Sequence, residues 1–185
     1  MYNTGKQLVT RRDFIQASAL VTGGLLAGCA TDGSLSAPSP VAVTPKSLEV
    51  LPKGGAPAPL ALRHFPSRLH AFVWRNWPVV PVERMAAVVG AQPADILRIG
   101  QAMGLGRPPR ITADQQRRSY ITVIKRNWHL LPYEQLLELL GWTPEELAYT
   151  LREDDFLYIK LGSLKPKCEP LRYAPPDEAM RRREA

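Results

Sequence analysis

One tripeptide occurs twice in this chain, at a distance of 51 residues. Arg75-Asn76-Trp77 returns as Arg126-Asn127-Trp128. Two prolines, a glutamate and a glycine recur at the same shift, and the apolar positions between them also match; the pairs are Pro81 and Pro132, Glu83 and Glu134, Gly90 and Gly141, and Pro93 and Pro144. Identical spacing of these residues predicts an internal duplication with a period of about 51 residues.

Each copy predicts two helices separated by a tight turn. In the second copy, the leucines at 136, 137, 139 and 140 form a broad apolar face, and Gly141 suits the left-handed conformation that ends a helix. Thr143-Pro144-Glu145-Glu146 then predicts a helix start with a capping box. The first copy repeats this plan with weaker caps, over residues 81–89 and from 93 to about 103.

A longer helix is expected before each pair, at about residues 67–77 and 113–128. The second of these is less well defined, because residues 121–124 are strand formers. The predicted unit is therefore helix, short helix, tight turn and helix, and it resembles a tandem helix-turn-helix arrangement.

The expected fold is mainly α, a single small helical domain at residues 61–173 made of two tandem helix-turn-helix-like repeats. The copies lie at about 67–105 and 113–157. A strand-like or extended stretch is expected at 154–162, with a rigid polar exit at 165–170. Residues 174–185 form either a charged tail or the beginning of a further domain.

The helix-turn-helix pattern raises DNA binding as an alternative function, and the charges argue against it. The candidate reading helix of the second copy and the residues after it carry acids that phosphate would repel, namely Glu145, Glu146, Glu153, Asp154 and Asp155. We therefore expect no nucleic-acid partner and interpret the tight corners as packing geometry.

The N-terminus has the composition of a signal peptide, expected to occupy residues 1–28. An uncharged run of small and apolar residues from Ala17 to Ala27 is about half the roughly 20 residues that a membrane-spanning helix needs. Thr10-Arg11-Arg12-Asp13-Phe14-Ile15 resembles the bacterial twin-arginine signal, with Gln16 where a lysine is common. The twin-arginine translocase would then recognise Arg11, Arg12, Phe14 and Ile15.

Leu26-Ala27-Gly28-Cys29 resembles a lipobox, which implies lipidation of the Cys29 thiol and cleavage just before it. The alternative is an ordinary secretory signal with an incidental cysteine. The resemblance implies an exported, membrane-anchored lipoprotein that faces the periplasm or the outer cell surface, with the membrane as a partner through Cys29. Two acyl chains would keep it there.

The mature chain would be modestly basic. Removing residues 1–28 takes away Lys6, Arg11, Arg12 and Asp13, so the formal charge falls from +7 to +5. This excess suits an anionic envelope surface or a polyanionic glycan, and it lacks the dense basic stripe of nucleic-acid binders. With Cys29 lipidated, Cys168 has no intrachain partner and is either a buried structural thiol or a site of intermolecular pairing.

Residues 29–60 are expected to form a tether. The stretch is rich in Pro, Ser and Ala, and it offers too few large apolar side chains to offset the entropy of ordering the backbone. Its prolines would make it partly extended.

No catalytic constellation, cofactor motif or metal site is apparent. His64, His70 and His129 lack the spacing and the companion carboxylates of a metal site. Trp77 and Trp128 either form the core or provide a platform for a glycan. Arg75 and Arg126 either have a structural role, covering these rings or pairing with Glu83 and Glu134, or contact a ligand.

A second resemblance concerns residues 126–173, especially Leu131-Pro132-Tyr133-Glu134 and the run from Lys165 to Tyr173. They look like the N-terminal region of large secreted bacterial proteins in which a glycoside-hydrolase-like barrel follows. That resemblance implies an accessory module of a carbohydrate-active enzyme. The main expectation is a non-catalytic, lipid-anchored binding or docking module, with a glycan or an envelope protein as candidate ligands.

Overall fold

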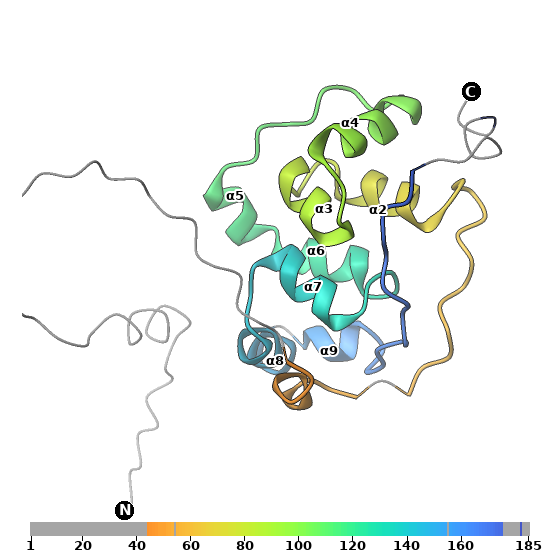
Figure 1. Cartoon of the computed structure of the whole chain (residues 1–185). Coiled ribbons are helices and arrows are strands. Elements are labelled where there is room, and N and C mark those ends of the chain that lie inside the picture. The colour runs from red at the N-terminus through yellow and green to blue at the C-terminus, as the bar shows by residue number, and fades with distance from the viewer. Residues whose placement is uncertain (1–43, 54, 155, 176–181, 183–185) are drawn as a thin grey trace, which may run out of the picture. The chain divides into compact units, whose positions relative to one another are not determined.

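In a computed structural model the chain is mainly α-helical, as the sequence predicts. The structure describes residues 44–53, 55–154, 156–175 and 182, all within one compact unit, Ser39–Ala185. The predicted signal peptide and Cys29 lie outside the described residues. In chain order the elements are the 3-10 helix η1 (Ser47–Val50) and the α-helices α2 (Arg68–Asn76), α3 (Val82–Val89), α4 (Pro93–Ala102), α5 (Ala113–Arg118), α6 (Tyr120–Asn127), α7 (Tyr133–Leu140), α8 (Pro144–Glu153) and α9 (Leu157–Lys160) (Figure 1).

The predicted corners are present. Gly90 ends α3 at φ 69°, ψ 36°, and Gly141 ends α7 at φ 70°, ψ 39°. In this left-handed region a side chain would be strained, whereas glycine is not. The capping box is also confirmed: Thr143 Oγ1 accepts from the Glu146 N–H at 3.2 Å, and a Glu146 carboxylate oxygen accepts from the Thr143 N–H at 2.8 Å.

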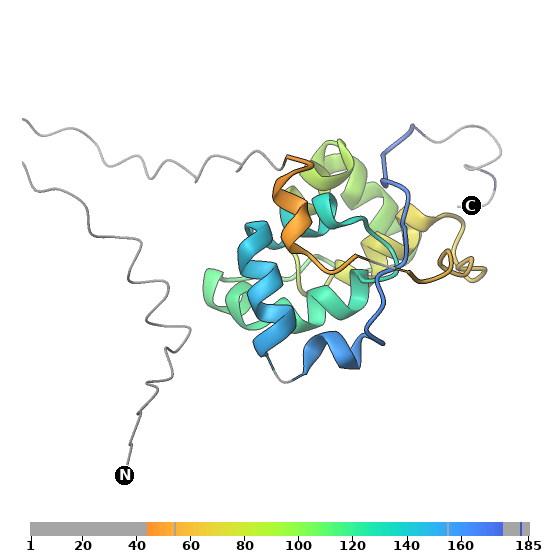
Figure 2. The ribbon, with the colours of Figure 1, turned by 90° about the horizontal axis from the view of Figure 1, so that it is seen from below.

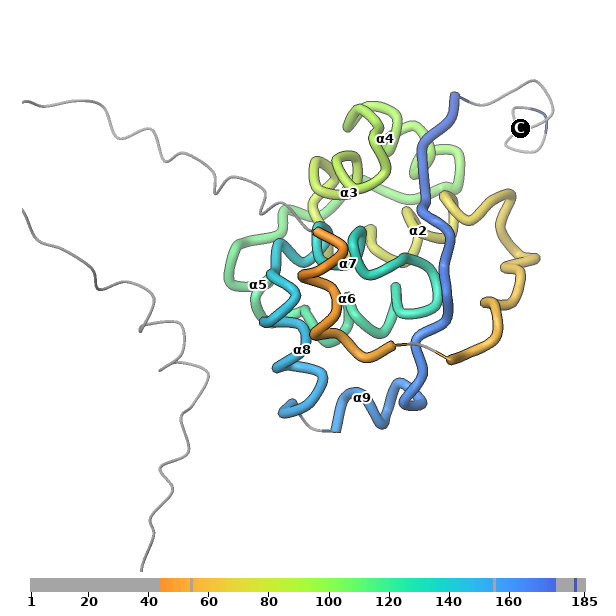
Figure 3. Tube along the Cα trace, turned by 60° about the horizontal axis from the view of Figure 1, so that its bottom comes forward, coloured from red at the N-terminus to blue at the C-terminus, as the bar shows by residue number. Residues whose placement is uncertain are grey.

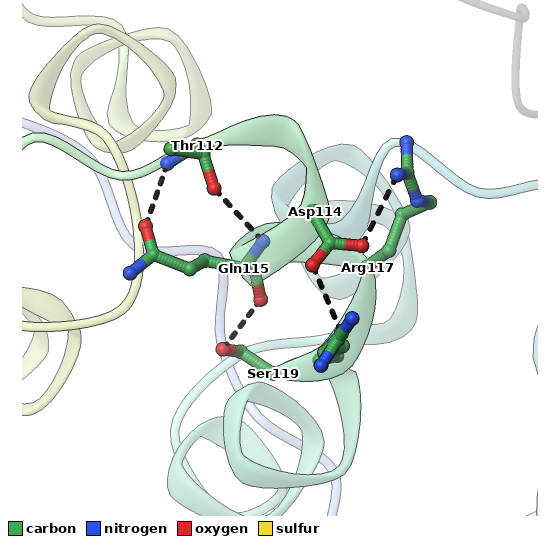
Figure 4. A network of polar contacts seen from close by, with 6 residues as sticks. Thr112, Asp114, Gln115, Arg117 and Ser119 are labelled. Carbon is green, nitrogen blue, oxygen red and sulfur yellow. Dashed lines mark hydrogen bonds and ion pairs between the residues drawn. The ribbon is translucent and has the colours of Figure 1, made fainter.

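The single helix expected at 113–128 is two helices. A break at Ser119 separates α5 from α6, and the Ser119 hydroxyl donates to the Gln115 carbonyl at 2.7 Å (Figure 4). Local polar contacts hold α5, including a Thr112–Gln115 capping box and ion pairs from Asp114 to the two arginines that end the helix. Despite its strand formers, the segment 120–127 is helical. Its buried residues stabilise the helix, because Val123 packs in the hydrophobic cluster around Phe72 and Ile124 packs in the one around Trp128.

The equivalent helices of the two copies contact each other. α2 packs against α6, and α3 packs against α7 (Figures 1 and 3). The same backbone hydrogen bonds recur at positions 51 apart: Ala91 N–H to Ala86 O at 2.9 Å matches Trp142 N–H to Leu137 O at 3.1 Å. The duplication itself stays a prediction that these contacts support.

The packed part of the chain begins earlier than the sequence predicts. Residues 47–50, assigned to the tether, form η1, which lies against α8 (Figure 2). Leu51 is only 3% exposed, and the Tyr133 hydroxyl donates to the Pro52 carbonyl at 2.9 Å. Two well-spaced leucines, Leu48 and Leu51, supply enough apolar contact to fix this segment although its composition is that of a linker.

The C-terminal segment differs in part from expectation. Residues 157–160, expected to be extended, form the helix α9. The following residues 164–175 are extended and run back over the domain, where the Tyr173 N–H donates to the Val89 carbonyl at 2.8 Å (Figure 3). In the described residues the β-type pairing is an isolated parallel bridge between Ala56 and Pro166. None of the described helices combines the length and the apolar character needed to cross a membrane.

Candidate functional site

A groove of about 1,370 Å³ opens where the two copies of the tripeptide meet. Its walls are residues 56–62, the C-terminal ends of α2 and α6 with the residues that follow them, and residues 161–166. Most of this lining is apolar and includes five leucines and several prolines; the leucines are Leu60, Leu62, Leu105, Leu161 and Leu164. We call it the basic groove, because its charged side chains are all cationic.

Arg75, Lys125, Arg126 and His129 line the basic groove, and none of the described residues that line it is acidic. The ion pairs found among the described residues leave out these four side chains. The positive charge of the groove is therefore not neutralised by a carboxylate of the described chain. This arrangement attracts an anion.

The two arginines cross over between the copies. Arg75 Nη1 donates to the Arg126 carbonyl at 3.1 Å, and Arg126 Nη1 donates to the Arg75 carbonyl. The expected pairing of these arginines with Glu83 and Glu134 is not what the described residues show. Each guanidinium instead binds the carbonyl at the end of the opposite helix, where cations are favourable, and keeps other N–H groups for a ligand.

Beneath the arginines, a pair of fully buried asparagines joins the copies. Asn76 donates to the Asn127 side-chain oxygen at 2.9 Å and Asn127 donates back at 2.8 Å. Their second donors bind the carbonyls of Phe72 and Val123, each four residues earlier and each at 2.8 Å. Both amides are thus satisfied without water, which fixes the backbone that carries Arg75 and Arg126.

Trp77 and Trp128 lie in the core, with exposures of 7% and 0%. Their indole N–H groups donate to the carbonyls of Gly106 and Leu164 at 3.1 and 2.6 Å. Of the two interpretations left open by the sequence, the structure supports core packing. Trp77 still presents an edge to the basic groove, whereas the half-exposed tryptophan there is Trp74, which stands 5.8 Å from the Phe65 ring centre.

His129 lies at the basic groove with a lowered pKa. The ring is largely exposed, and its partial desolvation at the groove wall is the main cause, to which the positive charges of Lys165 and Arg75 add. A neutral imidazole is therefore favoured near pH 7, and an anion in the groove would raise its pKa again. His70 is buried and bonded to the Ser67 hydroxyl at 2.8 Å, and His64 is exposed. In the described part of the chain we find no group of three or more metal-ligating side chains.

Lys165 is buried in a second pocket, of about 860 Å³, which we call the Lys165 pocket. Its Nζ donates to the Leu131 carbonyl at 2.7 Å and stands 5.3 Å from the centre of the Tyr133 ring and 5.5 Å from that of Trp128. The buried thiol of Cys168 is 3.7 Å away. Burial lowers the pKa of Lys165 and raises that of Tyr133. Carbonyls and aromatic rings satisfy this ammonium group, so it fastens the extended C-terminal segment to the domain.

Sequence reasoning located three residues of the basic groove, Arg75, Arg126 and Trp77, and missed most of its walls. Lys125 and His129 flank the second tripeptide and could have been found by considering its neighbours. The proline-rich wall at 56–62 has the composition of a linker, so its place in the groove could not be predicted. Lys165, in the other pocket, lies in a stretch that was expected to be polar and exposed. Both owe their positions to contacts with residues that are distant in sequence.

Comparison of this chain with family models, curated proteins and solved structures finds no match. The function is therefore inferred from the residues of this chain alone.

Proposed function

We propose that this chain is an exported, lipid-anchored envelope protein whose helical domain is a non-catalytic docking module, with the basic groove as its binding site. The observation that carries the proposal is an apolar groove whose charged lining residues are all cationic. The part of the proposal that concerns export and lipid anchoring rests on the residues around Arg11 and Arg12 and on Cys29.

The lining favours a ligand with an apolar body and an anionic group. Leucine and proline side chains would leave the hydroxyl groups of a neutral sugar without hydrogen-bond partners, which makes a plain glycan a poor fit. Lys125 and His129 are exposed at the groove and can approach an anion without disturbing the core. The volume exceeds the roughly 300–1,000 Å³ of compact small-molecule sites, which favours an extended ligand.

Binding of an anionic aromatic probe tests the groove. We expect anilinonaphthalene sulfonate, which joins an apolar ring system to a sulfonate, to bind the full chain with increased fluorescence. Lys125→Gln should weaken that binding, because it removes one cation from the groove. Lys167→Gln is the matched control, since this exposed lysine lies at the Lys165 pocket. Equal binding by both variants would contradict the proposed site, provided that circular dichroism shows the same fold.

Intact mass tests the export and anchoring half. Protein from the membrane fraction of a bacterial host should lack residues 1–28 and carry the mass of acyl chains, and Cys29→Ala should show no such mass. An unprocessed chain of unmodified mass in the soluble fraction would contradict the anchoring.

A further inference from the structure

We infer that the basic groove docks on the surface of a bilayer that contains anionic phospholipids, so that the domain lies against the membrane beside its own anchor. This inference rests on the proposed function and names the ligand of the same groove.

The apolar side chains at the groove include unusually exposed ones. Leu60 is 91% exposed, Trp74 52% and Leu164 46%, and all three line the groove. Exposed large apolar side chains that gather at one site, rather than lying scattered, mark an interaction surface. Tryptophan and leucine are also the side chains that enter the boundary between headgroups and acyl chains most readily.

The cations at the groove match the other component of such a surface. Arg75, Lys125 and Arg126 lie beside the exposed apolar residues, and the described lining offers no carboxylate that would be repelled by lipid phosphate. A bilayer with anionic lipids presents phosphate at its surface and hydrocarbon beneath it, and the groove offers cations for the first and exposed apolar side chains for the second.

Because the predicted anchor lies close to the domain in sequence, even a weak affinity of the groove for the bilayer surface would keep the domain docked. Fourteen residues lie between Cys29 and Thr44, where the described chain begins, so fifteen steps along the chain limit the distance of the domain from the lipid to about 50 Å. Within that reach the membrane surface is always at a high effective concentration. A soluble acidic polypeptide would fit the charge equally well, but it has no such advantage.

The test uses the full chain carrying Cys29→Ala, so that no acyl chain contributes. Cosedimentation with phosphatidylcholine vesicles is compared with and without phosphatidylglycerol, at physiological salt. We expect binding that depends on phosphatidylglycerol and becomes about fivefold weaker with Lys125→Gln, as for the loss of one cation at a membrane surface. Lys167→Gln should change it little. Binding through the N-terminal segment does not involve Lys125, so equal vesicle binding by the Lys125→Gln and Lys167→Gln variants overturns the inference.

A second measurement reads the contact directly. Phospholipids brominated in their acyl chains should quench the fluorescence of Trp74, and Trp74→Phe should remove most of that quenching when equal amounts of vesicle-bound protein are compared. Trp128 is fully buried and does not line the groove, so it provides an internal reference.

The outcomes separate the two proposals. Groove-dependent vesicle binding with quenching of Trp74 supports the inference. If the sulfonate probe binds the groove but Lys125→Gln leaves vesicle binding unchanged and Trp74 is not quenched, the bilayer inference is overturned and the proposed binding site stands. Displacement of the probe by a soluble acidic peptide, with no groove-dependent vesicle binding, overturns it in favour of a polypeptide partner. Failure of the probe to bind overturns both.

Discussion

The side-chain amides of Asn76 and Asn127 exchange two hydrogen bonds, of 2.9 and 2.8 Å, in the buried contact between α2 and α6. Each asparagine stands between an arginine that lines the basic groove and a tryptophan in the core. The pair therefore links the two copies of the tripeptide and holds the floor of the groove in position.

The asparagine pair should behave as one energetic unit. Asn76→Ala leaves polar atoms of Asn127 buried and unpaired, so we expect it to lower the free energy of unfolding by about 1–3 kcal/mol. Asn127→Ala should cost a similar amount, and the double variant should cost less than the sum, with a coupling of about 0.5–3 kcal/mol. Urea denaturation of the three variants measures this. Simple additivity would show that the two amides act independently.

Gly100 should be intolerant of a side chain. It lies in α4 directly under the ring of Trp77, and a Cβ there would overlap the buried, rigid indole. Gly100→Ala should therefore destabilise the protein by about 1–3 kcal/mol in thermal or urea unfolding, although alanine is the better helix former. Gly106→Ala is the control, because a Cβ at that position meets no atom within 4 Å. Equal stability of the two variants would contradict this packing.

Leu51 should contribute to stability, although its segment resembles a linker. Its side chain is 3% exposed and packs with the core around Trp128, whereas the neighbouring Val50 is 52% exposed. We expect Leu51→Ala to cost about 2–5 kcal/mol in unfolding experiments. Val50→Ala should change stability little. A small loss of unfolding free energy at both positions would show that residues 47–51 do not pack stably on the domain and belong to the tether.

His129 should titrate below the ordinary histidine value of 6.5, since burial and nearby cations disfavour its charged form. The histidine of the unfolded chain then takes up a proton at a higher pH than His129 of the folded chain. The neutral imidazole therefore contributes to the free energy of unfolding, and this contribution is complete above about pH 6.5. It is lost as the pH falls through the pKa of the folded state.

Proton NMR of the imidazole Cε1–H measures this pKa, with His129→Gln to assign the signal. Lys165→Met should raise the pKa of His129, because it removes one of the positive charges that lower it. An unchanged pKa of His129 in that variant would show that the charge of Lys165 has no electrostatic effect on the imidazole.

Local sequence signals account for most of the helices. Gly90 and Gly141, the prolines at the starts of α3, α4, α7 and α8, and the Thr143 capping box act within a few residues, so their geometry follows from the residues alone. The break at Ser119 and the helix α9 were missed. At Ser119 a side-chain bond to the Gln115 carbonyl competes with the regular helix, and in α9 packing of Leu157 in the core outweighs the strand propensity of its neighbours.

The sequence alone established the helical class, the turns and the repeated tripeptide, because these depend on periodicity and on the backbone preferences of single residues. Which tryptophan is buried, where the arginines bind and which segments close the basic groove depend on contacts between residues 29 to 110 positions apart. Such contacts have no local signature. Arg75 could be expected at a site, but its partner, the Arg126 carbonyl, appears only when α2 and α6 are packed together.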